Sequence, residues 1–406
     1  MKISIHDANV SFSKFFFVAL FWGYILYNFA ILFGAPSFLG GYFGVATLLG
    51  FLVFSLLLKS TLQNICKTSV FFSFLVITSF LWVTVVTLVS ALGGSNFQAR
   101  MQSYTLLVTW LPLFCTGFYI VLAEKEKLKK ISVFLLILFA FYAAYHVIST
   151  STYMLPFTKG GDVEDENFAT YQGIARNLSV IGIFLTAYIE SKFKNLVCVL
   201  MISILLFLVG ARSEFYAYML IALGYHALVA FKLKSSFLII LIFLVFSAGI
   251  AINYYEEIQS SRQFNISDLS QDASWSLRNE MKEYAVEQIK TYPILGNFGG
   301  HGYFDDAQGN SIGSYSHNIL SGYQNYGLLF FLSFGSMCYF SFFYSLKKLI
   351  QNPRDSDWVF AFLFTFLTAF LITFSKAIFW QVPYLAWGVF MGALYKDKFI
   401  KNKSRS

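Results

Sequence analysis

Long apolar runs separated by short polar stretches dominate the pattern of hydrophobic and polar positions along this chain. Each run is long enough to cross a hydrocarbon core, which takes about 20 residues of helix. The runs lack the alternation of a membrane β-barrel, and an open strand edge is excluded from lipid, so every run should be a helix. The pattern predicts one all-α, polytopic membrane domain over 1–406 with about twelve transmembrane helices. The predicted spans are 12–34, 40–58, 69–92, 103–122, 131–150, 173–189, 195–211, 214–231, 235–253, 318–346, 358–375 and 377–395.

Composition supports this interpretation and excludes other classes of protein. The chain has 406 residues, of which 57% are hydrophobic and only 12% charged. A soluble domain carries about 25% charged residues, so a soluble globular protein, a disordered chain and a disulfide scaffold are excluded. The first run follows Lys2 and Lys14 but is longer than the core of a signal peptide and lacks a small-x-small cleavage site. We therefore expect a retained helix.

Basic residues are distributed unevenly between the two sides of the predicted topology. With the N-terminus inside, 20 of the 29 Lys and Arg residues flank the inner ends of spans, which predicts that both termini are cytoplasmic. Five of the seven Arg residues fall outside. Because Arg makes bidentate contacts with phosphate or carboxylate, the outer side is favoured as the functional side. The basic tail at 396–406 predicts an anchor to inner-leaflet lipid rather than a nucleic-acid site.

Two outer segments are much longer than the other connections: 151–172, and the large loop 254–317 between the ninth and tenth spans. Loops of this length are usually functional or disordered. In the large loop, apolar residues at three- and four-residue spacing predict an amphipathic helix over 276–292, with Ser276 as its N-cap and Pro293 after its end. The predicted apolar face consists of Leu277, Met281, Tyr284, Ala285, Ile289 and Tyr292.

Three outer residues are candidates for catalysis. Arg278 falls in the first turn of the predicted helix, where free backbone N–H groups favour an anion; the alternative is a solvated surface Arg. His317 lies at the outer membrane boundary, where an imidazole can act as a general base; the alternative is a helix-capping or interface-anchoring His. Arg212 lies in a tight outer turn, where a charge is costly unless it is paired or faces a wet cavity. Its alternative role is a local ion pair with Glu214.

Further polar residues near the predicted outer membrane boundary are candidates for binding a charged substrate. Arg176 begins the sixth span, Lys376 lies in the turn between the last two spans, and His301 lies in the Gly-rich part of the large loop. Several cations converging near a His predict a cavity for a membrane-borne phosphate compound. The predicted substrate-binding residues are Arg176, Asn318, Lys376, Lys282, His301 and Glu214.

No metal ion and no other cofactor is expected. Asp305 and Asp306, or the acidic run at 162–166, could offer oxygens to a divalent cation, but acidic runs in outer loops are more often only solvated. The four Cys residues show no metal-type spacing and none lies in an outer loop. Enzymes that use polyprenyl monophosphate sugars commonly keep an acidic base in the first outer loop. The first outer loop of this chain reads GAPSFLGG and has no carboxylate, which disfavours an enzyme that uses polyprenyl monophosphate sugars.

Three motifs follow one another on the predicted outer side: VGARSEFYAYML after the seventh span, LRNEMKEYAVEQIKTYPILGNFG in the large loop, and SHNILSGYQNYGLLFF entering the tenth span. In these motifs the chain resembles the bacterial O-antigen polymerase and O-antigen ligase superfamily, mainly over 170–345. The resemblance implies a GT-C-like fold and a metal-independent, inverting glycosyltransferase at the periplasmic face of the bacterial inner membrane. The implied donor is a glycan on undecaprenyl diphosphate.

The resemblance also implies a role for each catalytic candidate. Arg212 and Arg278 match the arginines that hold the diphosphate, and His317 matches the His that activates the acceptor hydroxyl. Fixed Arg donors neutralise a diphosphate leaving group without a metal. One departure is the turn A-R-S-E, where many members have S-R-G, because it puts the carboxylate of Glu214 beside the key Arg.

Alternative functions remain open at this point. A polymerase transfers the glycan to a lipid-linked repeat unit, and a ligase transfers it to lipid A core; YQGIARN and the Y-P-I-L-G to S-H-N arrangement favour a polymerase. A non-enzymatic flippase for lipid-linked sugars should show repeat symmetry and polar residues at mid-membrane, and neither is clear here. The expected partners are the undecaprenyl-diphosphate-linked donor and acceptor, the lipid bilayer, a chain-length regulator and a flippase, with no nucleic acid.

Overall fold

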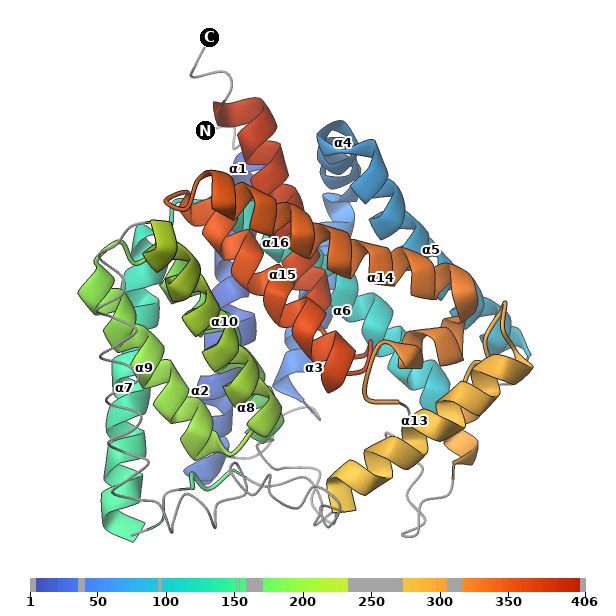
Figure 1. The fold of residues 1–406 in the computed structure, drawn as a ribbon, viewed down its shortest axis with the longest axis horizontal. Helices are drawn as coiled ribbons and strands as arrows, with labels where there is room; N and C mark the ends of the chain where they lie inside the picture. The colour runs from blue at the N-terminus through green and yellow to red at the C-terminus, as the bar shows by residue number, and fades with distance from the viewer. Residues whose placement is uncertain are drawn as a thin grey trace.

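The computed structural model describes residues 5–35, 41–93, 97–150, 152, 154–157, 171–232, 273–304 and 316–401 (Figure 1). In chain order the elements are α1 (Ile5–Phe17), η1 (Val18–Gly23), α2 (Tyr24–Leu32), α3 (Tyr42–Leu56), α4 (Leu58–Thr68), α5 (Val70–Leu92), α6 (Phe97–Leu122), α7 (Glu126–Thr150), α8 (Tyr171–Tyr188), α9 (Lys192–Val209), α10 (Arg212–Lys232), α13 (Ala273–Thr291), η2 (Gly300–Tyr303), α14 (Leu320–Gln351), α15 (Ser356–Phe374), α16 (Val382–Lys396) and η3 (Asp397–Lys401). The elements η1 and η3 are π-helical, and η2 is a 3₁₀ turn.

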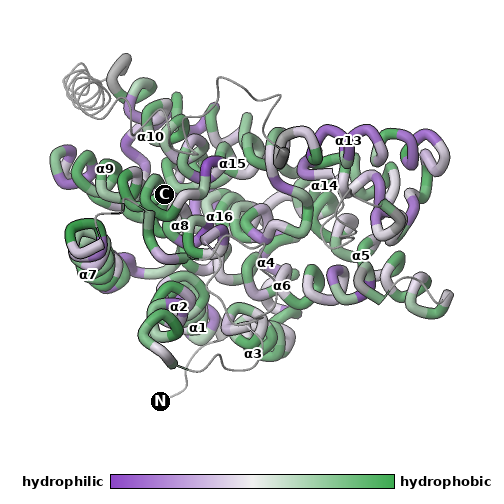
Figure 2. Tube along the Cα trace, turned by 90° about the horizontal axis from the view of Figure 1, so that it is seen from below, coloured by the Kyte–Doolittle hydropathy of each residue, from purple (hydrophilic) through white to green (hydrophobic). Residues whose placement is uncertain are grey.

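The bundle has two distinct ends. The start of α1 and the end of η3 lie together at one end, here named the terminal end, and α13 lies at the opposite end, here named the loop end (Figure 1). Hydrophilic residues are frequent along α13, whereas the bundle helices are mostly hydrophobic (Figure 2). This is the arrangement expected if both termini share one side of a membrane and the large loop occupies the other.

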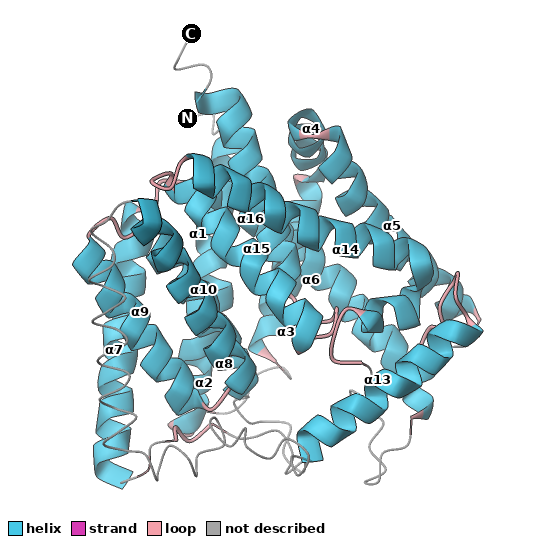
Figure 3. Ribbon diagram, viewed as in Figure 1, coloured by secondary structure: helices cyan, strands magenta, loops and turns pink. Residues whose placement is uncertain are grey.

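The described residues form helices and loops, with no strand among them (Figure 3), so the predicted all-α class is confirmed for this part of the chain. Seven helices here are long and apolar enough to cross a membrane. The α3 and α4 pair, bent by 76°, brings the number up to 8. The seven are Asp7–Leu32, Val70–Leu92, Ala99–Leu122, Glu126–Thr150, Lys192–Val209, Leu320–Gln351 and Ser356–Phe374.

This number is smaller than the predicted twelve for identifiable reasons. The predicted runs at 173–189, 214–231 and 377–395 do form helices, namely α8, α10 and α16. However, α16 is only 15 residues long, and α8 and α10 begin with polar turns that contain an Arg. The remaining predicted run, 235–253, lies outside the described residues.

A close contact between α6 and α16 forms the centre of the bundle. A Cβ atom on Gly388 would collide with the carbonyl oxygen of Phe114, so only Gly allows the two backbones to approach this far. Small residues play the same part in many membrane helix pairs. Nearby, Trp110 stacks on Tyr384 with ring centroids 4.5 Å apart. This contact fixes the start of α16, and therefore the turn before it that contains Lys376.

Buried ion pairs join the helices at the terminal end. Asp357, which is 7% exposed, lies 2.8 Å from the ammonium of Lys396 and 3.7 Å from that of Lys125. The hydroxyl of Tyr188 donates to the same carboxylate at 3.0 Å. Burial lowers the pKa of Lys125 to about 8, and the charge of Asp357 opposes this shift. These four residues, here named the terminal clasp, connect α8, α15, α16 and the link between α6 and α7.

Candidate functional site

Helix α13 packs on α14, and its predicted apolar face is buried at the centre. Met281 is 5% exposed and Ala285 is fully buried, which confirms the centre of the predicted stripe. Tyr292, at the end of the stripe, is instead 49% exposed. Gln288 occupies the buried face near that end, because its amide has partners in the loop that follows.

The start of α13 differs from the prediction. The helix begins at Ala273, three residues before the predicted N-cap Ser276. Arg278 consequently lies in the second turn, beyond the free N–H groups that favour an anion at a helix N-terminus. The anion-binding argument from the helix start is therefore wrong for Arg278, and its relevance depends on its neighbours in space.

The segment after α13 docks into a break in α14. Gly327 interrupts the helix with a φ of 74°, a left-handed conformation that favours Gly. At the break, the N–H of Leu328 donates to the carbonyl of Ile294 at 2.9 Å, and the N–H of Asn297 donates to the carbonyl of Gln324 at 2.6 Å. Loop backbone thus replaces helix hydrogen bonds lost at the break, as buried backbone groups require. The predicted single span 318–346 is two helical segments held by the PILG motif.

A buried network of amide side chains strengthens this docking. Nδ1 of His301 donates to the amide oxygen of Asn325 at 3.0 Å. Gln324 donates to the side chain of Gln288 at 2.8 Å, and Gln288 donates to the carbonyl of Gly300 at 2.9 Å. Burial lowers the pKa of His301, and the bond to Asn325 opposes this shift. The network places His301, a predicted substrate-binding residue, in a position that orients the loop.

Backbone contacts bring the start of α14 to the end of α15. The N–H of Ile319 donates to the carbonyl of Ile372 at 2.8 Å. Asn318, predicted to bind substrate, lies just before the N-cap Ile319, and its side-chain oxygen accepts the N–H of Leu320, the first residue of α14, at 2.8 Å. These bonds set His317, just before the helix, against the turn that contains Lys376.

His317 lies among positive charges at the loop end. Burial, followed by the charges of Arg278 and Lys376, lowers the pKa of His317 from 6.5 to about 4. The imidazole is therefore neutral at pH 7 and able to accept a proton. The three residues come from α13, the start of α14 and the turn between α15 and α16. The charges of Arg278 and Lys376 therefore act on His317, whereas their common role in a substrate site stays a prediction.

A buried carboxylate extends this group of charges. Glu214 is 2% exposed, and its Oε1 lies 2.6 Å from the ammonium of Lys376. Its charge also acts on Arg176. Arg176 in turn donates to the side-chain oxygen of Gln381, and its guanidinium carbon lies 4.1 Å from the ring centroid of Phe43. The name His317 cluster is used below for His317, Arg278, Lys376, Glu214 and Arg176.

The other predicted residues have different positions. Arg212 is the first residue of α10, where its charge acts on Tyr216 one turn later. It precedes Glu214 by two positions, which point to nearly opposite sides of a helix, so the ion partner found for Glu214 is Lys376 instead. Convergence of Arg212 with His317 stays a prediction. Lys282 is exposed on α13.

Several predictions fall on residues that the structure leaves undescribed. These are the acidic run at 162–166 and the pair Asp305 and Asp306. The expected absence of a metal ion therefore stays a prediction.

Sequence reasoning missed the amides that support the site. Gln288, Gln324 and Asn325 are each at most 9% exposed and join α13 to α14. A signal was present, because two adjacent amides inside an otherwise apolar run need hydrogen-bond partners wherever the run is buried. The neighbouring Gly327 was a second signal for a break in the helix.

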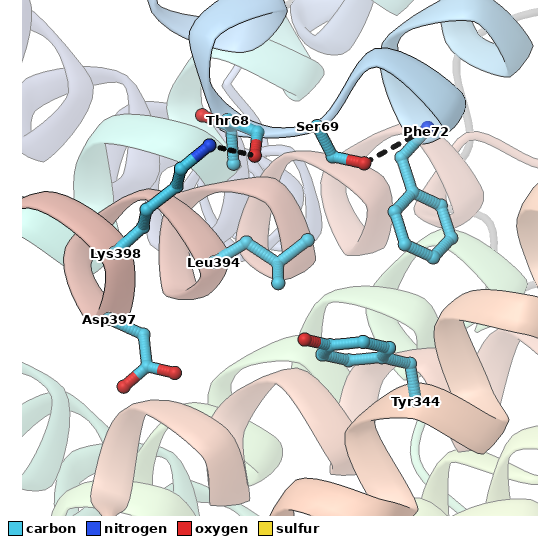
Figure 4. A pocket seen from close by; sticks show the side chains of 7 residues that line it. All are labelled: Thr68, Ser69, Phe72, Tyr344, Leu394, Asp397 and Lys398. Carbon is cyan, nitrogen blue, oxygen red and sulfur yellow. Dashed lines mark hydrogen bonds between the residues drawn. The ribbon is translucent and has the colours of Figure 1, made fainter.

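A separate cavity of about 310 Å³ lies at the terminal end (Figure 4). Lys398 donates to the carbonyl of Thr68 at 3.4 Å across it, and Asp397 pairs with Lys348 at 2.8 Å. The cavity is lined by Thr68, Ser69, Phe72, Tyr344, Leu394, Asp397 and Lys398. It is distant from the His317 cluster, which lies near the loop end.

No protein-family model and no curated protein sequence matches the chain.

Proposed function

We propose that this chain is an O-antigen, or surface polysaccharide, polymerase: an inverting, metal-independent glycosyltransferase of the bacterial inner membrane. Its donor is a glycan on undecaprenyl diphosphate, and its acceptor is a lipid-linked repeat unit at the periplasmic face. The observation that carries the proposal is that the charges of two cations from separate elements, Arg278 and Lys376, act on a neutral His317. A general base beside cations that can bind the leaving group is what transfer from a diphosphate requires.

The reaction assigns a task to each part of the His317 cluster. The acceptor hydroxyl attacks the anomeric carbon of the donor from the face opposite the diphosphate, and its proton passes to the imidazole of His317. The bond between the anomeric carbon and the phosphate oxygen breaks, and undecaprenyl diphosphate leaves with the electron pair. Arg278 and Lys376 stabilise the charge that develops on the leaving oxygen. The configuration at the anomeric carbon is inverted.

The low pKa of His317 is compatible with a role as a base. Two of its causes are the charges of Arg278 and Lys376. The negative diphosphate would offset both charges, which raises the pKa and makes the imidazole a stronger base. Donor binding would thus activate the base only when there is a leaving group to release.

The terminal clasp favours a transferase over a flippase. A transporter that alternates its access must open each end of its bundle in turn. Opening the terminal end here would separate Asp357 from two lysines and from Tyr188 in a buried place. Separating a buried ion pair costs several kcal/mol. A transferase that works only at the loop end needs no such opening.

Surface glycan from the native host tests the proposal. The gene is deleted and then restored as wild type, as His317→Ala, or as His146→Ala. His146 is a matched control, because it lies on α7 outside the His317 cluster. We expect the wild type and His146→Ala to restore a ladder on a polysaccharide gel, and His317→Ala to leave core with a single repeat unit.

Other outcomes would change the assignment. Bare core, with long glycan accumulating on the lipid carrier, would identify a ligase. Loss of repeat units from the outer face would identify a flippase. A normal ladder with His317→Ala, in membranes that contain the variant at wild-type level, would refute His317 as the base.

A further inference from the structure

The His317 cluster contains its own negative charge. Glu214 is buried to 2% exposure beside Lys376, with 2.6 Å between the charged atoms, and its charge also acts on Arg176. Arg278 and Lys376 act on His317, and Arg176 joins them through the charge of Glu214. Without Glu214, this group would hold only cationic or potentially cationic side chains. Like charges in a partly buried place repel one another strongly. The carboxylate of Glu214 reduces this repulsion while the site is empty.

We propose that Glu214 is a built-in stand-in for the substrate phosphate, and that an incoming diphosphate takes Lys376 from it. The proposal rests on the proposed function, because it assumes a diphosphate ligand for the cluster. Glu214 is then a positioning residue: it acts through Lys376 and keeps the empty site folded. It also competes with the ligand, so it weakens binding while it stabilises the protein.

Two features of the cluster support competition over a purely structural ion pair. Lys376 faces two groups at once, since it pairs with Glu214 and its charge also reaches His317. The long, flexible side chain of Lys376 is 14% exposed, whereas the side chain of Glu214 is almost fully enclosed at 2%. The carboxylate is therefore the fixed partner and Lys376 the mobile one.

The two roles predict effects of opposite sign for Glu214→Gln. Loss of the negative charge should lower the melting temperature of the empty protein by several degrees, because the cations lose their counter-charge. The same change should tighten binding of inorganic pyrophosphate by about tenfold, because no carboxylate competes for Lys376. A purely structural ion pair would instead weaken both properties together.

The experiment uses the full-length protein in lipid nanodiscs. Binding of pyrophosphate is measured by calorimetry, and unfolding by a thermal scan without ligand. The matched control is Glu283→Gln, which removes the same charge from an exposed position on α13. It should change the affinity by less than about twofold, since an exposed charge is screened by salt. Unchanged or weaker binding by Glu214→Gln would overturn the proposal.

A second variant covers the case in which Glu214→Gln does not fold. Glu214→Gln with Lys376→Met removes both members of the pair, a change that is often tolerated. Because the released cation is then missing, pyrophosphate should bind more weakly than to the wild type; unchanged affinity would overturn the proposal. Arg278→Gln separates this proposal from the function it rests on. If wild type and Arg278→Gln bind pyrophosphate equally, the diphosphate site itself is refuted.

Discussion

Removing the charge of Arg278 should raise the pKa of His317 by a limited amount. Burial is the largest cause of the fall from 6.5 to about 4, and Arg278 is the second. Arg278 therefore accounts for less than half of the fall in pKa, or less than about 2 kcal/mol. In Arg278→Gln, the pKa of His317 should rise above about 4 and still stay below its ordinary value, because burial is unchanged as the largest cause.

The measurement is hydrogen–deuterium exchange at Cε1 of each His, followed by mass spectrometry over a pH series. This exchange reports the titration of individual imidazoles in an intact membrane protein. Lys282→Gln is the control, because Lys282 is an exposed cation on the same helix as Arg278. The reasoning would be refuted if wild-type His317 titrated near 6.5, or if the two variants gave the same pKa.

The same shift has a consequence for stability. Because the pKa of His317 is lower in the folded state than its unfolded value of about 6.5, protonation favours the unfolded chain. Stability contributed by the neutral imidazole is full above pH 6.5 and is lost as the pH falls through 4, by about 3 kcal/mol. Unfolding of Arg278→Gln between pH 6.5 and 4 should therefore depend less on pH than unfolding of the wild type.

Three further predictions concern the scaffold. Gly327→Ala places a Cβ against the carbonyl oxygen of Ile294 and forces a non-Gly residue into a positive φ. The resulting backbone strain of about 1–3 kcal/mol should loosen α13. Limited proteolysis should then cut the segment 273–304 faster than in the wild type. Asn325→Leu removes the acceptor of His301 from a buried network and should lower the free energy of unfolding by about 1–3 kcal/mol. The melting temperature should fall, and an unchanged melting temperature would contradict the network. Asp357→Asn leaves two partly buried lysines without a counter-charge and should cost about 3 kcal/mol, whereas Tyr188→Phe should cost about 1.5–3 kcal/mol. Glycan synthesis by protein that remains folded should persist in both variants.

Local patterns predicted the features that depend on neighbouring residues in the chain. The apolar runs marked most of the helices, because in lipid only a helix satisfies the backbone within one segment. The spacing of Met281 and Ala285 identified the buried side of α13, since both residues follow the helical period. The distribution of basic residues predicted termini at one end and the large loop at the other (Figure 1).

Features that depend on contacts between distant segments were decided by the tertiary structure. Nothing near Glu214 in the sequence indicates that Lys376 is its partner, because the two side chains meet only after α10 and the turn before α16 are packed. The break at Gly327 likewise depends on carbonyl and N–H groups supplied by the segment after α13. The sequence by itself determined the helices and the residue types available for chemistry. Folding determined which charges meet, because their energies depend on distance and burial rather than on order along the chain.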